Sequence, residues 1–558
     1  MRLSGKRALL EQLRADGVRH IFGNPGTTEQ GFMDMLQEYP DIQFVLALHE
    51  GVAISMADAY ARLTRKPAFA EVHIAPGLGN ALGMMHNARV GGSPVVVYAG
   101  QSESRALFQE PHLSGALVDM ARPLCKWAAQ IEHAHDVPQA LRRAFKVAAE
   151  PPQGPVFLAL PLDVLDEEAE VDIVPTSHTR WHTRPDAAAL SEAADLLLRA
   201  KNPMFVVGDG VWLAQAHAEV VALAELLGLP IQECYPSEFN VPMTHPLYMG
   251  TTDFVSSKRL RASLEGCDVL LAVGTPLFQI IFPEPEAPAI PKDTRIVQID
   301  ANSWQLGRNF PPAVGMLADP KNALAELAEL VRRRRSPSQA DVAAKRAEKI
   351  GARTQAARHS YWQHAHERWD SVPISGARLM CEIKDAAPAN ALFFNEAITN
   401  ATHLDRAFEP SEPEKMMRVR GGGIGGGLPG AIGAQIARPD RKVVGICSDG
   451  ASMYSITALW TAAHHRVPLT WVILNNASYR ILKLNMIEYL GQAAARDRQF
   501  VAMDLTDPDL RFDHMAKAMG VPSWRVEKPE ELGPALREAF ACGPSLVDVA
   551  MEAPLPLS

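Results

Sequence analysis

The strongest constraint on the fold is a repeated change of hydrophobic period along the chain. Short apolar runs rich in β-branched residues alternate with longer stretches of helical period. Examples in chain order are QFVLALHEG, SPVVVYAGQ, MFVVGDG, KVVGICSDG and LTWVILNN. Strands that alternate with helices form parallel sheets covered by helices, so we expect an α/β fold.

The length of the chain and two breaks in the pattern predict three tandem domains. At 558 residues the chain is too long for a single hydrophobic core. A Pro- and His-containing stretch at 171–185 indicates a linker, and an Arg- and Ala-rich stretch at 330–363 indicates a solvated helix or tether. We place the three domains, each with a parallel sheet flanked by helices, at 1–180, 186–335 and 370–550.

Charge and cysteine content narrow the class of partner. A net charge of −9 argues against a surface for nucleic acid or anionic membranes, which requires a basic field. The six cysteines are far apart and form no CxxC pair, which is typical of reduced thiols in a cytoplasmic protein. The sequence shows neither an apolar signal core near the N-terminus nor a run long enough to cross a membrane. We therefore expect a cytoplasmic protein that binds small molecules.

The segment 443–476 carries the most informative pattern. It predicts a strand, a turn at 448–452, a helix at 453–465 and a second strand that ends in a pair of asparagines. Both strands of a parallel βαβ unit end at the same edge of the sheet. Asp449 and Asn476 are therefore expected to lie side by side.

These residues have the chemistry of a magnesium and diphosphate site. The Asp449 carboxylate, the Asn476 amide oxygen and a backbone carbonyl, that of Ser478, are hard oxygen ligands. Two diphosphate oxygens and a water would complete an octahedral Mg²⁺ shell. The residues after Asp449 open a helix whose free N–H groups suit a phosphate. These residues are Gly450, Ala451 and Ser452.

A plain structural reading of the same motif exists, because Asp-Gly and Asn-Asn often occur in turns and loops. The chain provides an internal comparison. Gly208-Asp209-Gly210 also follows a predicted strand, but Pro236 stands at the spacing at which Asn476 follows Asp449. The earlier turn therefore predicts no metal site.

Asp-Gly, a helix, a strand and Asn-Asn together resemble the thiamine-diphosphate signature, with Ser448 where that signature normally begins with Gly. The resemblance runs along nearly the whole chain and is strongest toward benzoylformate decarboxylases, within the wider group of acetolactate synthases and pyruvate decarboxylases. Supporting stretches are FGNPGTTE, ALHEGVAISMADAYAR, GLGNALG, PQGPVFLALP and GGGLPGAIGAQIA. The resemblance implies thiamine diphosphate and Mg²⁺ as cofactors. It also implies a pyrimidine-binding first domain, a middle domain and a diphosphate-binding third domain.

The resemblance assigns catalytic roles to three residues of the first domain. Glu50, at the start of a predicted helix, corresponds to the glutamate that activates the cofactor through the N1′ atom of its aminopyrimidine. His73 corresponds to the histidine that relays protons, and Thr27 supplies a hydroxyl for the substrate carboxylate where the family usually has Ser. From position alone, Glu50 could equally be a helix-dipole partner, and a lone His is more often structural.

Cofactor contacts are expected from the last third of the chain. In GGGIGGGLPG, glycines such as Gly422 allow close approach of the backbone to a ring, and Ile424 matches the aliphatic residue between the two cofactor rings. Asn395 and its neighbour Glu396 end a strand at the same edge and are weaker candidates. Ile481 follows the Asn pair and is expected to face the cofactor and the substrate.

The implied function is a 2-keto acid decarboxylase or carboligase, acting on a 2-keto acid or an aldehyde. Ile281 replaces a second active-site His, and Ile481 and Asn485 replace a small and an aromatic residue of the benzoylformate enzymes. These departures indicate a smaller or more polar substrate space. The alternatives are an acetolactate-synthase-like ligase and a non-catalytic relative, and the middle domain shows no persuasive FAD signature. The resemblance also implies a homodimer or homotetramer whose sites are shared between chains.

Overall fold

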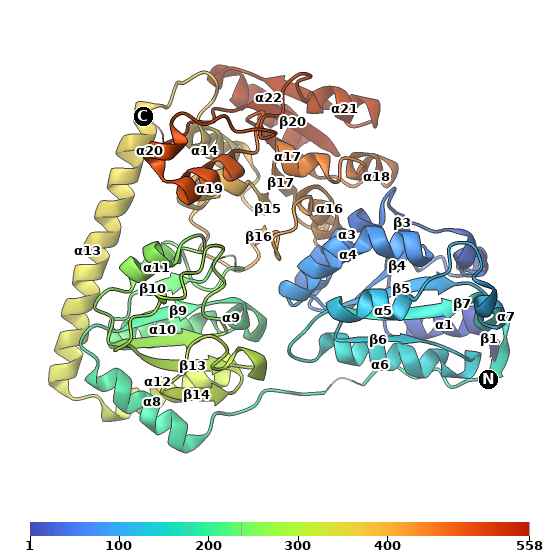
Figure 1. Ribbon diagram of the computed structural model, residues 1–558, viewed down its shortest axis with the longest axis horizontal. Helices are drawn as coiled ribbons and strands as arrows, with labels where there is room; N and C mark the ends of the chain where they lie inside the picture. The colour runs from blue at the N-terminus through green and yellow to red at the C-terminus, as the bar shows by residue number, and fades with distance from the viewer. Residues whose placement is uncertain (178, 236, 557–558) are drawn as a thin grey trace. The chain divides into compact units, whose positions relative to one another are not determined.

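The computed structural model describes residues 1–177, 179–235 and 237–556 of the chain. It confirms an α/β protein in which helices flank parallel sheets (Figure 1). Within the described residues, every helix is too short or too polar to cross a lipid bilayer.

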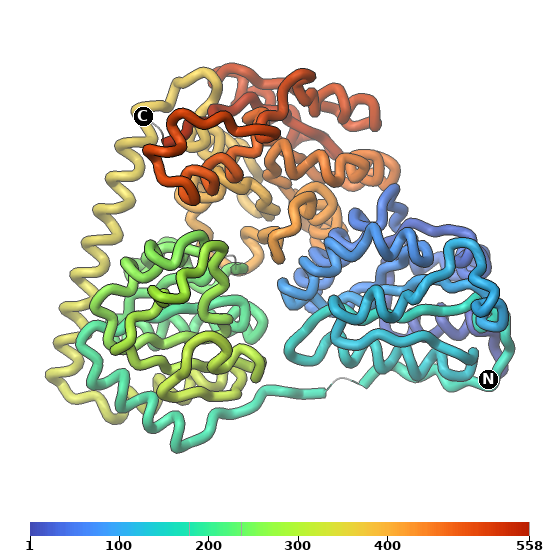
Figure 2. The backbone as a smooth tube through the Cα atoms, viewed as in Figure 1, coloured from blue at the N-terminus to red at the C-terminus, as the bar shows by residue number. Residues whose placement is uncertain are grey.

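The chain forms two compact units, and Figure 2 shows the course of the backbone within each of them. The first unit contains both ends of the chain and comprises Met1–Thr179, Ser371–Ala401 and Val419–Ser558. The second unit comprises Arg180–Asp370 and Thr402–Arg418. Each unit has its own hydrophobic core, so the two are described separately.

The N-terminal part of the first unit is built on a parallel sheet of six strands. Its strands, in spatial order, are β3 (Gln43–Leu46), β2 (His20–Gly23), β4 (Ala68–Val72), β5 (Val95–Gln101), β7 (Val156–Pro161) and β6 (Trp127–Gln130). Apolar side chains of α1 (Gly5–Ala15) and α6 (Val137–Ala149) pack on one face around Phe69, Val96 and Leu158. The helices α3 (Glu50–Thr64) and α4 (Ile74–Val90) begin directly after β3 and β4, so their first residues lie at the carboxyl edge of the sheet.

The C-terminal part of the first unit holds a second parallel sheet. Its strand order in this unit is β15 (Leu392–Glu396), β17 (Val443–Ser448), β18 (Thr470–Asn475), β20 (Ser545–Ala550) and β19 (Ser523–Val526). Helix α16 (Gly427–Ala437) packs between this sheet and α3. A Cβ atom at Gly433 would lie 2.1 Å from the Met56 carbonyl oxygen, so the two helices approach this closely only because residue 433 is glycine.

One local prediction in this sheet is wrong. The residues 448–452 form no turn; they enter the short helix α17 (Asp449–Met453), and the predicted single helix at 453–465 is instead α18 (Ala458–His464). The helix starts at once because the Ser452 hydroxyl donates a hydrogen bond of 2.8 Å to the Ser448 carbonyl, which closes the first turn. Asp449 therefore stands at the junction of strand and helix.

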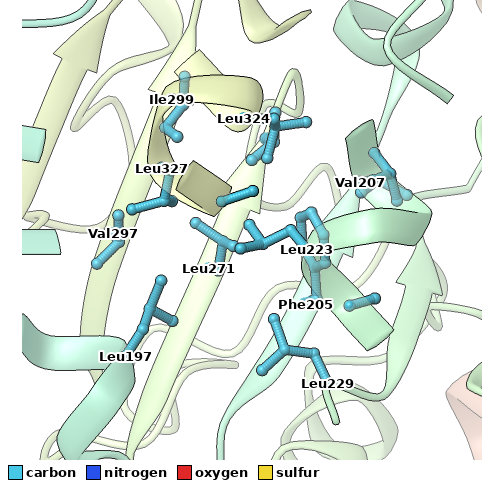
Figure 3. Packing of buried hydrophobic residues seen from close by; sticks show 14 of the residues in the cluster. Leu197, Phe205, Val207, Leu223, Leu229, Leu271, Val297, Ile299, Leu324 and Leu327 are labelled. Atoms are coloured by element: carbon cyan, nitrogen blue, oxygen red, sulfur yellow. The ribbon is translucent and has the colours of Figure 1, made fainter. Parts of the chain in front are cut away.

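The second unit has a parallel sheet of its own, with the strand order of a doubly wound fold. Its strands in spatial order are β11 (Tyr248–Thr251), β10 (Ile231–Glu233), β9 (Met204–Val207), β12 (Val269–Val273), β13 (Arg295–Asp300) and β14 (Val314–Leu317). Side chains from the sheet, including Phe205, Leu271 and Val297, interleave with leucines of α10 (His217–Leu227) and α12 (Pro320–Arg334) (Figure 3).

The Arg- and Ala-rich stretch is the helix α13 (Pro337–Glu367), which confirms the expectation of a solvated helix. Ser336 and Gln339 form a capping box at its start, which satisfies backbone N–H groups of the first turn. Of its 31 residues, only Ala343 and Thr354 are buried, so its weak hydrophobic period reflects exposure to solvent on most sides.

Candidate active site

The carboxyl ends of β17 and β18 bring the predicted metal ligands together. The two strands are parallel neighbours, with Ser448 opposite Leu474 in the register. Asp449 follows the first strand and Asn476 the second, and both line one open pocket with an empty volume of about 360 Å³. The adjacency expected from the βαβ pattern is therefore present in the structure.

Two oxygen atoms in this pocket fit a bound cation. Asp449 Oδ2 and Asn476 Oδ1 are both buried, and neither makes a hydrogen bond within the described part of the chain. Burial raises the pKa of Asp449 to about 6, whereas the backbone N–H groups of Gly450, Ser478 and Ala477 favour its ionised form. A hard dication would satisfy both oxygens and stabilise the carboxylate, so these residues fit Mg²⁺.

The other lining residues agree with a diphosphate beside the cation. Among residues 1–177, 179–235 and 237–556, no group of three or more His, Cys, Asp or Glu side chains is arranged to hold a metal ion. A cation beside Asp449 and Asn476 would therefore need further oxygen ligands. The predicted residues in the lining are Asp449, Asn476, Ser478, Gly450, Ala451, Ile424 and Ile481. Thr399, Tyr479 and Arg480 also line the pocket, and sequence reasoning missed them because they belong to no recognisable motif.

Three predicted cofactor residues lie outside this lining. Ser452 is fully buried and its hydroxyl points back to the Ser448 carbonyl. Asn395 Oδ1 accepts a hydrogen bond of 2.8 Å from the backbone N–H of Ala397, which fixes the turn after β15. Gly422 has a φ of +86°, and a Cβ atom there would meet open space.

Glu396 anchors the glycine loop that carries Ile424. Its carboxylate accepts hydrogen bonds from the backbone N–H groups of Gly425 at 2.8 Å, Gly426 at 3.3 Å and Gly427 at 2.8 Å. Burial raises the pKa of Glu396 to about 7, while the three N–H groups oppose this shift. The Glu396 side chain therefore holds the backbone of the glycine loop. The sequence alone suggests a contact with the cofactor instead.

Glu50 lies at the carboxyl edge of the N-terminal sheet as the first residue of α3. Its side chain is buried, and both carboxylate oxygens accept hydrogen bonds from amides. Asn24 donates to Oε1 at 3.1 Å and Asn80 donates to Oε2 at 3.0 Å. A Cβ atom at Gly77 would lie 2.6 Å from Glu50 Oε1, so this glycine leaves room for the carboxylate. The carboxylate is thus held by neutral donors and has no cation beside it in these contacts.

His73 is oriented by a carboxylate that sequence reasoning missed. His73 Nδ1 lies 2.9 Å from Oε2 of Glu29, whose side chain is completely buried. Glu29 also accepts hydrogen bonds from the N–H groups of Gly26 and Gly100 at 3.0 and 2.8 Å and from the Thr28 hydroxyl at 2.7 Å. This set of donors keeps Glu29 an acceptor, so Nδ1 of His73 carries the proton and Nε2 is left for other partners.

Thr27 is exposed at the start of the short 3₁₀ helix η1 (Thr27–Glu29), whereas Thr28 is buried against Glu29. Thr27, Glu50 and His73 are absent from the lining of the pocket that Asp449 and Asn476 share, as far as the described residues show. Within one chain the predicted residues form two groups. One lies at the carboxyl edge of the N-terminal sheet, and the other lies at the carboxyl edge of the C-terminal sheet.

Three family models match the chain in succession. They are the thiamine pyrophosphate enzyme N-terminal TPP binding domain at residues 3–116, the central domain at 190–327 and the C-terminal TPP binding domain at 398–549. Together they span most of the chain.

Full-length relatives agree with these matches. Benzoylformate decarboxylase from Pseudomonas aeruginosa is 32% identical over 97% of this chain and 98% of its own. Sulfoacetaldehyde acetyltransferase from Castellaniella defragrans is 27% identical over 96% and 90%. The solved structure of Rhodococcus jostii thiamine diphosphate-dependent 4-hydroxybenzoylformate decarboxylase has a TM-score of 0.85, 28% identity and complete coverage of both chains. The chain therefore belongs to the thiamine pyrophosphate enzyme family and is a thiamine-pyrophosphate-dependent lyase or carboligase.

Proposed function

We propose that the enzyme decarboxylates a 2-keto acid that is smaller or more polar than benzoylformate, with Mg²⁺ tethering the diphosphate of its cofactor. The pair of unsatisfied oxygens on Asp449 and Asn476 supports the metal site, because most buried polar atoms of proteins are paired and these two line the same pocket. Similarity to benzoylformate decarboxylases supports the substrate class. Bound thiamine diphosphate would supply a nucleophilic carbon for the keto group and a positively charged thiazolium ring that takes up the electron pair left behind by departing carbon dioxide.

The proposed cofactor contacts follow the two ends of the molecule. Asp449, Asn476 and the Ser478 carbonyl hold the metal, and the backbone of Gly450, Ala451 and Ser452 faces the diphosphate. Ile424 supports the cofactor rings, with Gly422 giving the loop its backbone shape, and Ile481 borders the reacting end. Asn395 has a supporting role at the adjacent strand end. The placement of seven of these residues in one pocket supports this assignment.

The proposed chemistry of the chain's own residues is proton handling. Glu50 shares a proton with the pyrimidine ring, a task that suits a carboxylate held by neutral amides and therefore free to exchange a proton. His73, with Nδ1 fixed by Glu29, presents Nε2 to the substrate as the proton donor and acceptor. The Thr27 hydroxyl binds the substrate carboxylate.

We further propose a homodimer or homotetramer in the cytoplasm, with domains at 1–180, 186–335 and 370–550. The separation of the predicted residues into two groups supports sites shared between chains. The pocket of Asp449 lacks Glu50, His73 and Thr27 in its lining, so an N-terminal domain from a second copy would complete it.

Extraction of the purified enzyme, followed by an absorption spectrum and a mass, tests the cofactor. We expect thiamine diphosphate without FAD. A panel of 2-keto acids with product identification then tests the reaction. An aldehyde with release of carbon dioxide supports decarboxylation, whereas an inert panel would reject it.

Ligation is the second candidate, because Ile481 lines the pocket and relatives include an acetyltransferase. The same panel, with an added aldehyde as acceptor, separates the two reactions. Release of a free aldehyde supports decarboxylation, and an acyloin that forms faster than the aldehyde supports ligation.

A further inference from the structure

Glu71 is a buried carboxyl group that the proposed chemistry does not use. It lies on β4 with no exposed surface, and neither of its carboxyl oxygens makes a hydrogen bond to the described residues. The parallel register places it opposite Gly23 on β2 and opposite Tyr98 on β5. A Cβ atom at Gly23 would lie 2.5 Å from Glu71 Oε2, so the carboxyl group fits only beside glycine.

The charged groups around Glu71 are the two carboxylates of the N-terminal site. Glu29 and Glu50 both face it, and their negative charges add to the effect of burial in raising the pKa of Glu71 well above its usual range. The backbone N–H of Asn24 opposes this shift. Beside Glu71, Tyr98 is also buried with a hydroxyl group that lacks a hydrogen bond in the same described set.

The difference between the three carboxyl groups lies in their donors. Glu29 accepts hydrogen bonds from two backbone N–H groups, a hydroxyl and His73, and Glu50 accepts two from amides. Donors of this kind favour a carboxylate anion. Glu71 has no comparable set, and a third anion beside the other two would be buried without compensation.

We propose that Glu71 is a positioning residue that stays protonated in the working enzyme, and that its ionisation sets the alkaline limit of activity. The proposal rests on the proposed roles of Glu50 and His73. A negative charge on Glu71 would repel the carboxylate of an incoming 2-keto acid. It would also repel the carboxylates of Glu29 and Glu50, which disturbs the orientation of His73. The neutral acid fills the space between the sheet strands without adding charge.

The pH profile of kcat/KM tests this proposal in the intact holoenzyme. For a single ionisation, kcat/KM falls about tenfold for each pH unit beyond the alkaline limit. Gln has the size of Glu and cannot ionise, so Glu71→Gln is expected to move this limit to higher pH by at least one unit, relative to the maximum of its own profile. Glu132→Gln, an exposed residue of the same domain, is the matched control and is expected to keep the original limit. An alkaline limit that stays in place in Glu71→Gln would overturn the proposal.

Infrared spectroscopy gives a second test that requires no turnover and does not depend on Glu71→Gln folding. At neutral pH the difference spectrum between the holoenzyme and Glu71→Asp is expected to show the carbonyl stretch of a protonated carboxylic acid, because the bands of other buried acids such as Glu396 and Asp300 cancel. Glu71→Asp is expected to shift this band, and alkaline titration of the unmodified enzyme to remove it. Absence of the band at neutral pH, or a band that is identical in Glu71→Asp, would reject a neutral Glu71. If no 2-keto acid is turned over, the proposed reaction fails while this measurement still decides the state of Glu71.

Discussion

Two Asp-Gly pairs of the same chain differ in what surrounds the carboxylate. In both, a helix begins at the aspartate directly after a buried strand, α17 at Asp449 and α9 (Asp209–Ala214) at Asp209. Asp209 Oδ1 accepts a hydrogen bond of 2.9 Å from the backbone N–H of Glu238, which ties down the next loop. Asp449 instead faces Asn476 across the strand ends and keeps Oδ2 without a hydrogen bond among the described residues.

The space beside the two Asp-Gly pairs differs as well. In the second unit, a Cβ atom at Gly210 would lie 2.4 Å from the Gly274 Cα, so the backbone of β12's end fills the position that a ligand would need. Beside Asp449 the corresponding space is an open pocket. Pro236, which marks the missing partner of Asp209 in the sequence, lies outside the described residues. The comparison teaches that the same motif becomes a ligand site only when the neighbouring strand also ends in a donor and leaves room.

The largest expected effect is a difference in cofactor retention between variants of Asp449 and Asp209. Asp449→Asn removes the negative charge from the proposed metal site, and we expect cofactor retention after desalting, and with it turnover, to fall by more than about 100-fold. Asp209→Asn keeps a hydrogen-bond acceptor for Glu238 and is expected to retain the cofactor. Thiamine diphosphate in the desalted protein can be measured by fluorescence after oxidation. Equal retention in the two variants would remove Asp449 from the metal site.

A second prediction distinguishes loss of the cofactor from loss of its activation. Glu50→Gln preserves the size of the side chain but cannot share a proton as a carboxylate does. We expect near-normal cofactor retention, with exchange of the thiazolium C2 proton for deuterium slowed by about 100-fold or more. Nuclear magnetic resonance of quenched samples measures the exchange. An unchanged exchange rate would contradict the role of Glu50.

A third prediction uses both inactive variants together. If the sites are shared between chains, a hybrid dimer of Glu50→Gln and Asp449→Asn chains contains one site with both residues intact. Co-expression with two different tags, followed by purification on both, is expected to recover about half of the activity per dimer. A verified hybrid without activity would count against shared sites.

The smallest expected effect concerns Asp300, a third aspartate at a strand end, here β13 of the second unit. Burial raises its pKa to about 7, although the N–H of Asn302 favours the ionised form. The folded protein therefore binds this proton more tightly than the unfolded chain, so stability is complete below about pH 4 and falls as the pH rises toward 7. Asp300→Asn has no such titration. We expect its free energy of unfolding, relative to the unmodified chain, to rise by about 1–3 kcal/mol between pH 4 and pH 8. Urea unfolding at the two pH values measures this change, and a constant difference would argue against a protonated Asp300.

The features that followed from the sequence depend on short-range rules. Alternating strands and helices predict parallel sheets, and parallel strands place their ends at one edge, so Asp449 and Asn476 could be paired before any coordinates were known. Glu29 could not be found in this way. Two of its partners, Gly100 on β5 and His73 just after β4, are distant from it in the sequence, and only the sheet brings them to the same carboxylate.

Glu71 was hidden for a related reason. A single acidic residue inside an apolar run looks like the solvent-facing position of a half-buried strand. The structure covers both faces of β4, so the residue is inside the protein. Burial by helices from elsewhere in the chain is a property of the fold that the strand's own sequence does not encode.

The hydrogen bonds between Glu396 and the glycine loop have a consequence for redesign of the enzyme. Three consecutive amides donate to the Glu396 carboxylate, and Asn87 holds Gly423 through two further hydrogen bonds, so the course of the loop is fixed through its backbone. Residue 424 can then be replaced by smaller or larger side chains in a library of variants, while the backbone of the loop keeps its path. Substrate scope and the course of the loop would then depend on different residues, and a search for new substrates can vary Ile481 while Ile424 is kept for the cofactor and Glu396 for the loop.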